Sequence, residues 1–467
     1  MQNKKNVIFI MLDTLRADIL KLYGGSLKLN NIDRIAQYGR VYDMALAPGT
    51  YTLPSHLSLF LGKRPLRIKS LKASGFKSSD IMTDPFARKS KYIQGEITLA
   101  GMMCAFGYNS ALFSNNPFLS DYTGLTDGFS YSSNLFIDKM LESNRAHVKA
   151  ILKLIENDRV RKSLIDIACM ASLPMTKDML DSTYMKLRKK LNFYFSKEYG
   201  YYNLDKGAEE TNRQILEYAK TNKSTRNFIF VNYMEGHEGY PTDMVTKKYV
   251  EQDKWLYMVG KSDLEDIKHV MEAYFRRIRY LDSEIGKTMD ILKKSGLLDD
   301  STVIITSDHG QGFMEHGQMF HNIHPYNEVI HVPLIIADFE SGKQINCKQR
   351  IENPFSIMNL NQMIAGKFDQ NHAPLVCDHV GITEVWDSYL LNKIKGRSKS
   401  AKDILKKKKE LDMQATAIIG KRYKLMHFYG LRKDELYDIT ADPYETHDII
   451  DSKRDIAHSL LAYNNIL

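Results

Sequence analysis

Three short polar segments of this chain carry side chains suited to metal-assisted attack on an ester. Thr52 opens a Thr-Leu-Pro-Ser-His run, Asp13 ends an apolar run, and Asp308-His309 ends another. Carboxylate and imidazole groups are common ligands of divalent cations. A hydroxyl beside such a cation and beside a helix N-terminus is placed to attack an anionic ester. Singly, Asp13 could be a helix cap and Thr52 a capping or packing residue, so the prediction rests on their combination.

These segments are far apart along the chain, so the fold must bring them together. Apolar runs that predict buried strands lie at 6–12, 110–114, 227–234, 303–306 and 332–336. Helical patterns separate them at 32–38, 98–106, 208–219 and 264–294. This alternation predicts an α/β fold with a large, mostly parallel sheet flanked by helices. Asp13, Asn115, Glu235 and Asp308 then fall at the carboxyl ends of strands, where such sheets gather their chemistry.

Two regions break the alternation and suggest the domain organisation. Residues 136–203 are rich in Met, Leu and Lys at helical spacing, which predicts a helical insertion that packs on the sheet or forms a lid or partner surface. We assign residues 1–375 to the catalytic domain. Residues 376–467 are assigned to a small α+β subdomain, since apolar runs within them suit an antiparallel sheet.

Charge and cysteine content narrow the class of protein. The 467 residues carry a net charge of +9, from 65 basic and 56 acidic side chains, which favours anionic partners. No nucleic-acid-recognition motif accompanies this charge, so we do not expect nucleic acid as a partner. The basic run 393–409 is either a solvated segment or a peripheral contact with an anionic membrane. The four cysteines form no zinc or disulfide pattern.

The location expected from the sequence is the cytoplasm. Sparse cysteine use suits a reducing compartment. The apolar run 6–12 is too short for a signal peptide core, and no apolar stretch approaches the roughly 20 residues needed to cross a bilayer. The sequence leaves the oligomeric state open.

Several segments, in order along nearly the whole chain, resemble the sulfatase branch of the alkaline phosphatase superfamily. The matching segments are NVIFIMLDTLRAD (6–18), NIDRIAQYG (31–39), YTLPSHLSLFLGKRP (51–65), TLAGMMCAFGYNSALFSNN (98–116), TSDHGQGFMEHG (306–317) and ELYDITADPYE (435–445). The resemblance implies an alkaline phosphatase-like fold and a metal-dependent hydrolase of phosphate or sulfate esters.

The resemblance also assigns roles to residues of the metal site. Asp13, Asp308 and His309 match the family's metal ligands, and Thr52 matches its nucleophile and a fourth ligand. Thr14 stands where many sulfatases have a second Asp. His309 stands where many calcium-binding sulfatases have Asn, and imidazole favours manganese or zinc over calcium or magnesium.

The substrate pocket is assigned in the same way. His237 matches a pocket histidine, and His321 falls near the position of a substrate-binding lysine, so that either could protonate the leaving oxygen. The further pocket candidates are His56, Asn115, Asn116, Glu235, His316 and His324. Glu235 could alternatively complete a second metal site, as in two-metal relatives.

The nucleophile position departs from the sulfatase pattern. Sulfatases of this family use C-x-P-S-R or S-x-P-S-R, whose first residue is oxidised to formylglycine. Thr52 is not a substrate for that modification, so no formylglycine is expected, and His56 replaces the arginine. A threonine nucleophile is similar to that of the superfamily's phosphoethanolamine and glycerol-phosphate transferases.

We therefore predict a sulfatase-like hydrolase that acts through a covalent Thr52 intermediate. Phosphate mono- or diesters are favoured over sulfates, because a phosphothreonine can be broken by water attacking phosphorus. The anionic substrate could be linked to a glycan or a lipid. Two alternatives stay open: a transferase that moves a phospho-group onto a glycan or lipid headgroup, and a non-catalytic scaffold on the same fold.

Overall fold

The computed structural model describes residues 6–68, 93, 95–121, 123–135, 204–223, 225–238, 264–317, 319–321, 324–366, 380–385, 414–429 and 433–466. The predicted helical insertion (136–203), the basic run (393–409) and the predicted domain boundary at 375 lie outside these residues. Within the described ranges, every helix is too short or too polar to span a lipid bilayer.

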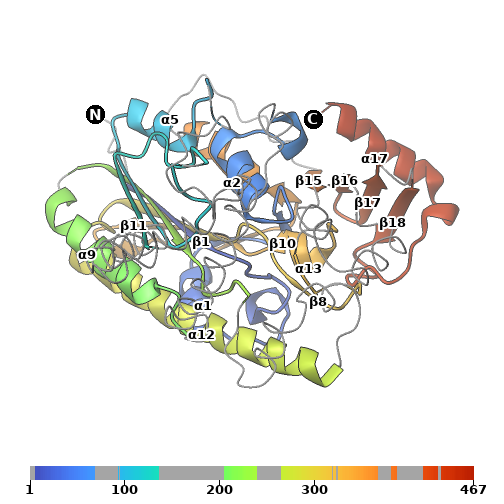
Figure 1. Ribbon diagram of the computed structural model, residues 1–467, viewed down its shortest axis with the longest axis horizontal. Helices are drawn as coiled ribbons and strands as arrows, with labels where there is room; N and C mark the ends of the chain where they lie inside the picture. The colour runs from blue at the N-terminus through green and yellow to red at the C-terminus, as the bar shows by residue number, and fades with distance from the viewer. Residues whose placement is uncertain are drawn as a thin grey trace, which may run out of the picture.

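A nine-stranded sheet forms the centre of the protein (Figure 1). Its strands, in spatial order, are β13 (Gln349–Ile351), β2 (Arg40–Tyr42), β11 (Leu334–Glu340), β7 (Ser301–Thr306), β1 (Asn6–Leu12), β6 (Asn227–Tyr233), β4 (Asn109–Ser114) and β5 (Tyr131–Asn134), with β12 (Lys343–Gln344) beside β11. The run from β7 to β5 is parallel, whereas β11 is antiparallel to β7, β2 and β12. The predicted mixed, mostly parallel sheet is thus confirmed.

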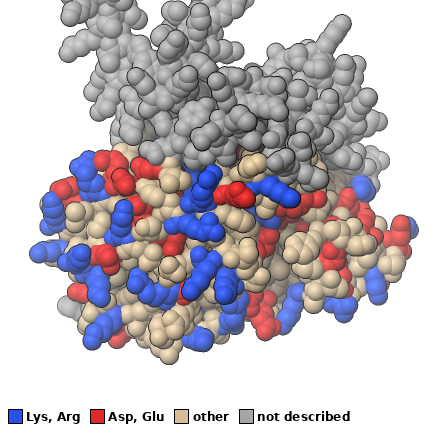
Figure 2. Space-filling view, turned by 90° about the horizontal axis from the view of Figure 1, so that it is seen from below, with Lys and Arg blue, Asp and Glu red and all other residues tan. Residues whose placement is uncertain are grey.

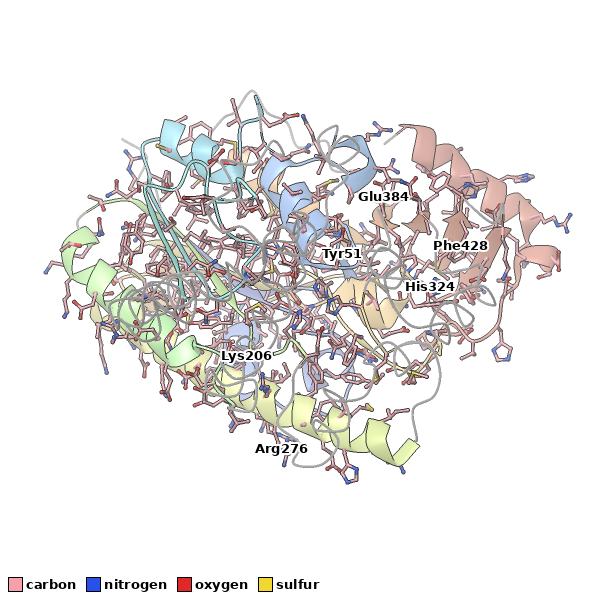
Figure 3. All side chains as sticks on the ribbon, in the orientation of Figure 1. Tyr51, Lys206, Arg276, His324, Glu384 and Phe428 are labelled. Carbon is pink, nitrogen blue, oxygen red and sulfur yellow. The ribbon has the colours of Figure 1, made fainter. Side chains whose placement is uncertain are left out.

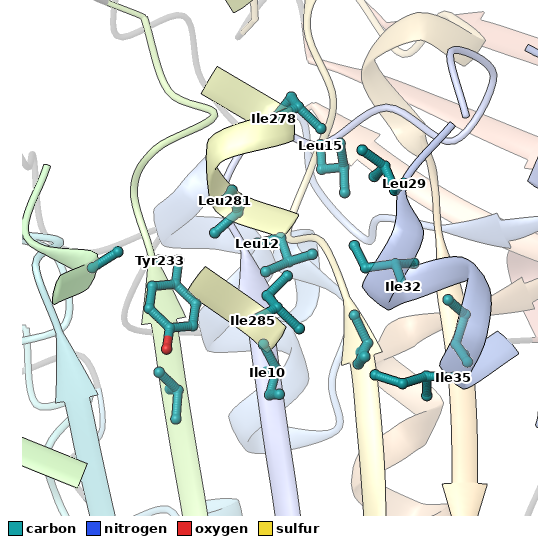
Figure 4. Packing of buried hydrophobic residues seen from close by; sticks show 14 of the residues in the cluster. Ile10, Leu12, Leu15, Leu29, Ile32, Ile35, Tyr233, Ile278, Leu281 and Ile285 are labelled. Atoms are coloured by element: carbon teal, nitrogen blue, oxygen red, sulfur yellow. The ribbon is translucent and has the colours of Figure 1, made fainter. Parts of the chain in front are cut away.

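Helices cover both faces of this sheet, because alternate side chains of each buried strand point to opposite sides. On one face, Ile8, Ile10 and Leu12 of β1 belong to a hydrophobic cluster with three helices. These helices are α1 (Asn30–Gln37), α9 (Ala208–Asn222) and α12 (Leu264–Lys294). Figure 4 shows Ile10 and Leu12 close to apolar side chains of α12. Seen from the α12 side, basic and acidic side chains are interspersed on the described surface (Figure 2).

The other face of β1 packs in a second cluster. Val7, Phe9 and Met11 contribute to it, together with apolar side chains of three further helices. These helices are α2 (Thr52–Leu61), α5 (Leu99–Ala105) and α14 (Leu360–Gly366). The continuous apolar run of β1 is therefore explained by burial of both its faces.

A smaller antiparallel sheet follows near the C-terminus. It consists of β15 (Gly381–Val385), β16 (Ala415–Ile419), β17 (Tyr423–Phe428) and β18 (Lys433–Asp438), covered by α17 (Arg454–Ile466). Short elements between the two sheets are β3 (Ala45–Leu46), β8 (Gly312–Phe313), β9 (Met319–Phe320), α13 (Asn327–Ile330), β10 (His331–Val332) and β14 (Phe355–Ser356). The predicted C-terminal antiparallel sheet is confirmed.

The strand register brings the polar segments to one edge. Met11 of β1 pairs with Asn232 of β6 on one side and with Thr306 of β7 on the other. The chain therefore leaves the three parallel strands at the same level. Asp13 follows β1 directly, and Asp308 follows β7 after one intervening residue.

Candidate active site

Two adjacent strand ends bring three ionisable side chains together. Asp13 follows β1, and Asp308 and His309 follow β7; all three side chains are fully buried. One potential ligand atom from each lies within 4.8 Å of the others. The three ligands predicted from the sequence are thus neighbours in the fold.

The electrostatics of this cluster fit a divalent cation. Burial and the neighbouring Asp308 raise the pKa of Asp13 well above its ordinary value. Burial also raises the pKa of Asp308 to about 7. Oδ1 of Asp13 is buried and receives no hydrogen bond among the described residues. A cation would favour the ionised form of both carboxyls and would occupy this otherwise unsatisfied oxygen.

His309 offers the matching nitrogen ligand. Its Nδ1 donates to the carbonyl of Gly310 at 2.9 Å, which leaves the lone pair on Nε2. Burial lowers the pKa of His309, so the ring is held in the neutral form that binds metals. Oγ1 of Thr52 lies 3.3 Å from this Nε2 and is placed to donate to it.

Thr52 occupies the first residue of α2. The helix begins at Thr52 and includes Pro54, which is tolerated within a first helical turn. The Thr52 side chain is 3% exposed. The free backbone N–H groups and positive potential of the helix N-terminus therefore lie beside the hydroxyl and favour a bound anion.

His56 supports the Thr52 turn from within the protein. Its Nδ1 donates to the carbonyl of Thr52 at 2.9 Å and lies 3.6 Å from Oδ2 of Asp308. Burial lowers the pKa of His56 to about 4, so the ring is neutral near pH 7. Phe60 and Phe230 pack edge-on against it. The replacement of the motif arginine by His56 therefore removes a fixed positive charge from this position.

The turn after β1 is tightly fitted to the turn after β6. Thr14 has a φ of 60°, which is unusual for a β-branched residue, and its Oγ1 donates to the carbonyl of Asp13 at 2.7 Å. The Thr14 amide donates to Oδ1 of Asp308 at 3.3 Å. A Cβ on Gly236 would lie 2.3 Å from the Asp13 carbonyl oxygen, so only glycine fits there.

The two asparagines after β4 have different surroundings. Nδ2 of Asn116 donates to Oδ2 of Asp13 at 2.8 Å and so orients a candidate metal ligand. Nδ2 of Asn115 instead points to Oγ1 of Thr211 on α9, at 3.4 Å. Their predicted roles in substrate binding stay predictions.

The two predicted pocket histidines lie together beside the group formed by Asp13, Asp308 and His309. The His321 ring centroid is 4.4 Å from that of His309 and 5.3 Å from that of His237. Nδ1 of His237 lies 3.0 Å from Oε2 of Glu238, and Nδ1 of His321 lies 3.8 Å from the same oxygen. The sequence reading missed Glu238, although it follows the same strand end as His237.

Glu235 is directed to the start of α9. Its Oε1 accepts hydrogen bonds from the amides of Lys206 at 2.9 Å and Ala208 at 3.1 Å. Burial raises the pKa of Glu235 to about 7. The Lys206 ammonium, which the sequence reading also missed, donates to the carbonyls of His237 at 2.6 Å and Glu238 at 2.8 Å. Lys206, which is labelled in Figure 3, thereby fixes the turn that carries the side chains of His237 and Glu238.

The last two pocket candidates lie towards the C-terminal sheet. His316 stacks on Tyr326 with ring centroids 3.6 Å apart, and its Nδ1 is 2.7 Å from Oε1 of Glu328. The His324 ring makes an edge contact with Phe428 of β17, at 5.9 Å between centroids (Figure 3). These contacts give both histidines a structural partner, and their binding to substrate stays a prediction.

Comparison with known proteins agrees with the family resemblance seen in the sequence. The family model described as Sulfatase matches residues 5–369. The N-acetylglucosamine-6-O-sulfatase of Bacteroides thetaiotaomicron is 22% identical over 510 residues, which cover 96% of this chain and 82% of that protein. The arylsulfatase K of Canis lupus familiaris is 31% identical over 101 residues, so the chain spans only 18% of that relative, with 22% of its own length.

Solved structures show the same fold at low identity. The phosphonate monoester hydrolase of Agrobacterium radiobacter has a TM-score of 0.62 and 17% identity, covering 99% of this chain and 94% of that one. A putative sulfatase from Bacteroides thetaiotaomicron has a TM-score of 0.61 and 14% identity, covering 99% and 91%. These likenesses confirm the predicted alkaline phosphatase-like architecture.

Proposed function

Because this chain belongs to the sulfatase family of the alkaline phosphatase-like superfamily, we propose that it is a metal-dependent hydrolase of phosphate or sulfate esters that acts through Thr52. One observation carries the proposal. The Thr52 hydroxyl begins a helix and lies 3.3 Å from Nε2 of His309, within a buried group of potential metal ligands. A hydroxyl in such surroundings can serve as a nucleophile towards an anionic ester.

Asp13, Asp308 and His309 would hold the cation, with Thr52 beside them. A bound divalent ion would lower the pKa of the Thr52 hydroxyl and offset negative charge on the ester. The imidazole of His309 favours manganese or zinc. Asn116 would keep Asp13 in place through its hydrogen bond to Oδ2.

In the proposed reaction, the phosphoryl group of the ester is transferred to the protein and then to water. Thr52 gives up its proton to solvent, and its Oγ1 bonds to phosphorus while the bond from phosphorus to the leaving oxygen breaks. The leaving oxygen takes a proton from the protonated ring of His237 or His321. Water then attacks phosphorus, and the bond from phosphorus to Oγ1 breaks. Oγ1 of Thr52 takes up one of the two protons of that water, the other goes to solvent, and the product released is phosphate from a monoester or a phosphate monoester from a diester.

The threonine favours phosphorus over sulfur as the reacting centre. Hydrolysis of a phosphothreonine by attack at phosphorus regenerates the hydroxyl. A sulfothreonine is harder to release by that route, and Thr52 cannot provide the aldehyde hydrate that expels sulfate by elimination. Substrates linked to a glycan or a lipid remain within the proposal.

Substitutions of the nucleophile test it. Thr52→Ala should abolish turnover of aryl phosphates, phosphodiesters, phosphonates and sulfates, whether manganese, zinc or calcium is supplied. Thr52→Ser, which keeps a hydroxyl, should retain part of the activity, and Thr446→Ala, on the exposed C-terminal surface, should retain all of it. Full turnover by Thr52→Ala would disprove the role of Thr52, and a marked preference for sulfates would disprove the preference for phosphorus.

The transferase alternative differs in its acceptor. A hydrolase releases phosphate in plain buffer at an unchanged rate when an alcohol is added in small amounts. A transferase turns over slowly until an acceptor hydroxyl is supplied and then forms a new ester. Product analysis with and without glycerol or a sugar alcohol distinguishes the two.

A further inference from the structure

A hollow with a volume of about 400 Å³ lies between Asn109 at the start of β4, Tyr131 at the start of β5 and Tyr218 of α9. We call it the β5 hollow, after the last strand of the central sheet. It lies beside α9, at the left in Figure 1. Its volume falls within the range of small-molecule sites, roughly 300–1,000 Å³. The other residues that line it are Ser130, Glu217, Thr221 and Asn222.

The β5 hollow lies at the opposite end of the strands from the Asp13 group. Ser114, the last residue of β4, pairs with Asn232 of β6, which in turn pairs with Met11 near the end of β1. Asn109 is the first residue of β4, so the hollow begins roughly 17 Å along the strand from the level of Ser114. The residues that line the hollow therefore take no part in the proposed reaction.

Two tyrosine rings form a rigid aromatic surface at the hollow. Their ring centroids are 5.6 Å apart, and both rings pack against Phe113 of the core, at 5.3 Å for Tyr131 and 5.7 Å for Tyr218. The Tyr218 hydroxyl donates to Oδ1 of Asn227 at 2.9 Å, which fixes that ring. Tyr131 is 39% exposed, although it stands on a strand of the central sheet. Because the rings are already ordered, a ligand that packs on them loses little free energy to the ordering of side chains.

Polar side chains beside these rings offer hydrogen-bond acceptors. Oε1 of Glu217 lies 2.7 Å from Nζ of Lys220, but both side chains are more than half exposed, so the ion pair is weak. The Glu217 carboxylate can therefore accept further hydrogen bonds. Nδ2 of Asn109 donates to Oγ1 of Thr225 at 3.1 Å, while no described residue donates to its Oδ1. A carboxylate and an amide oxygen are thus available next to the aromatic surface.

This combination of groups favours one class of ligand. No lysine or arginine is among the described residues that line the hollow, so an anion such as phosphate finds no cationic partner there. The single carboxylate is shared with Lys220, which disfavours a bound cation. A sugar ring in the pyranose form suits both kinds of surface, because its apolar C–H face packs on an aromatic ring and its hydroxyls donate to carboxylate and amide oxygens. We propose that the β5 hollow binds a sugar residue of a neutral glycan, an interaction that does not depend on the proposed function.

Saturation-transfer NMR tests this proposal. Full-length protein is mixed in turn with maltotriose, cellotriose, xylotriose and triacetylchitotriose, and separately with adenine, a planar ring without sugar hydroxyls. We expect transfer to at least one trisaccharide. Tyr131→Ala should raise the dissociation constant of that sugar about tenfold, whereas Tyr131→Phe, which keeps the ring, should bind nearly as well as unaltered protein. Tyr463→Ala removes a tyrosine of matching exposure, 40%, from α17 and should bind the sugar fully.

A second substitution separates loss of binding from misfolding. Glu217→Ala changes an exposed side chain of α9, so it should leave the melting temperature unchanged and still weaken binding of the same sugar. No transfer to any of the four trisaccharides, transfer to adenine alone, or equal sugar binding by unaltered, Tyr131→Ala and Glu217→Ala proteins would overturn the sugar site. Thr52→Ala should bind the sugar as unaltered protein does. Failure of the sugar site would therefore leave the role of Thr52 untouched, and an active Thr52→Ala protein would leave the sugar site untouched.

Discussion

At the scale of single residues, hydrogen bonds fix the orientation of the side chains in the candidate site. His309 and His56 both donate through Nδ1 to a backbone carbonyl, which leaves Nε2 of each ring without its proton. Asp13 is held through Oδ2 by Asn116, while its Oδ1 stays available. This preorganisation would let a cation bind without rearranging the proposed ligands.

We expect Asn116→Ala to weaken binding at the Asp13 site by about 10- to 100-fold, because Asp13 then loses the amide that orients it. Titration of metal-free protein with manganese, followed by calorimetry, measures the change. Asn115→Ala is the matched control, since its amide points to Thr211 on α9 and should leave the affinity unchanged. Equal effects of the two substitutions would show that Asn116 does not act through Asp13.

The side chains that meet at these strand ends could be predicted from the sequence, whereas their surroundings could not. Asp13, Thr52, Asp308 and His309 stand in recognisable segments at strand ends or before a helix. Glu238 lies three residues beyond Glu235, and the sequence alone did not indicate which carboxylate would turn towards the histidines. Lys206 has no motif around it, and its function depends on backbone carbonyls that approach only in the folded chain.

At the scale of elements, three parallel strand ends and one helix start define the site. The strands and helices themselves were predictable, because β1, β6 and β7 are apolar and α12 has a long helical pattern. The start of α2 could not be predicted from the sequence, because a proline near a helix start is compatible with either a turn or the first helical turn.

The segment between β8 and α13 provides a pH test at this scale. Burial by itself would lower the pKa of His316, but the hydrogen bond and charge of Glu328 outweigh it, and the pKa is raised above 6.5. Protonated His316 therefore stabilises the folded state fully below pH 6.5, and this stabilisation is lost as the pH rises through the folded-state pKa.

We expect His316→Gln to cost about 1–2 kcal/mol of unfolding free energy near pH 6 and clearly less in alkaline buffer. Urea unfolding of metal-free protein at both pH values measures the difference. His447→Gln, an exposed histidine on the C-terminal surface, should show no such change. A cost for His316→Gln that is the same at both pH values would contradict the assignment of a charged pair.

At the scale of the whole molecule, a buried ion pair ties the C-terminal sheet to the chain that leads into the nine-stranded sheet. Lys424 of β17 lies fully buried, with Nζ 2.5 Å from Oε1 of Glu445. Nζ also donates to Oδ1 of Asn327 at 3.1 Å, and Oε2 of Glu445 accepts from the Asn327 amide at 2.7 Å. Asn327 begins α13, which leads through β10 into β11 of the nine-stranded sheet.

Lys424→Met should destabilise the protein by about 3–5 kcal/mol, because it leaves the Glu445 carboxylate buried without its cation. The double variant Lys424→Met/Glu445→Met should recover most of this loss, since two apolar side chains replace the pair. Chemical denaturation of both variants measures the effect. If the double variant is as unstable as the single one, the cost comes from packing and not from the unpaired charge.

The overall architecture was predictable from the order of strand and helix patterns together with the resemblance to the sulfatases. The contacts between the C-terminal sheet and the rest of the protein could not be predicted in this way. Lys424 and Glu445 are charged residues in polar stretches, where full burial is unusual, and their pairing joins segments that no sequence periodicity connects.

A covalent bond between Thr52 and the transferred group is the step of the proposed reaction that can be measured most directly. Metal-loaded protein is mixed with an activated aryl phosphate, quenched in acid within the first turnover, digested, and analysed by mass spectrometry. We expect one phosphoryl group on the peptide that contains Thr52, absent from the Thr52→Ala protein and from samples quenched after the substrate is consumed. Turnover without any phosphoryl group on Thr52, or with the group on another residue, would contradict the mechanism.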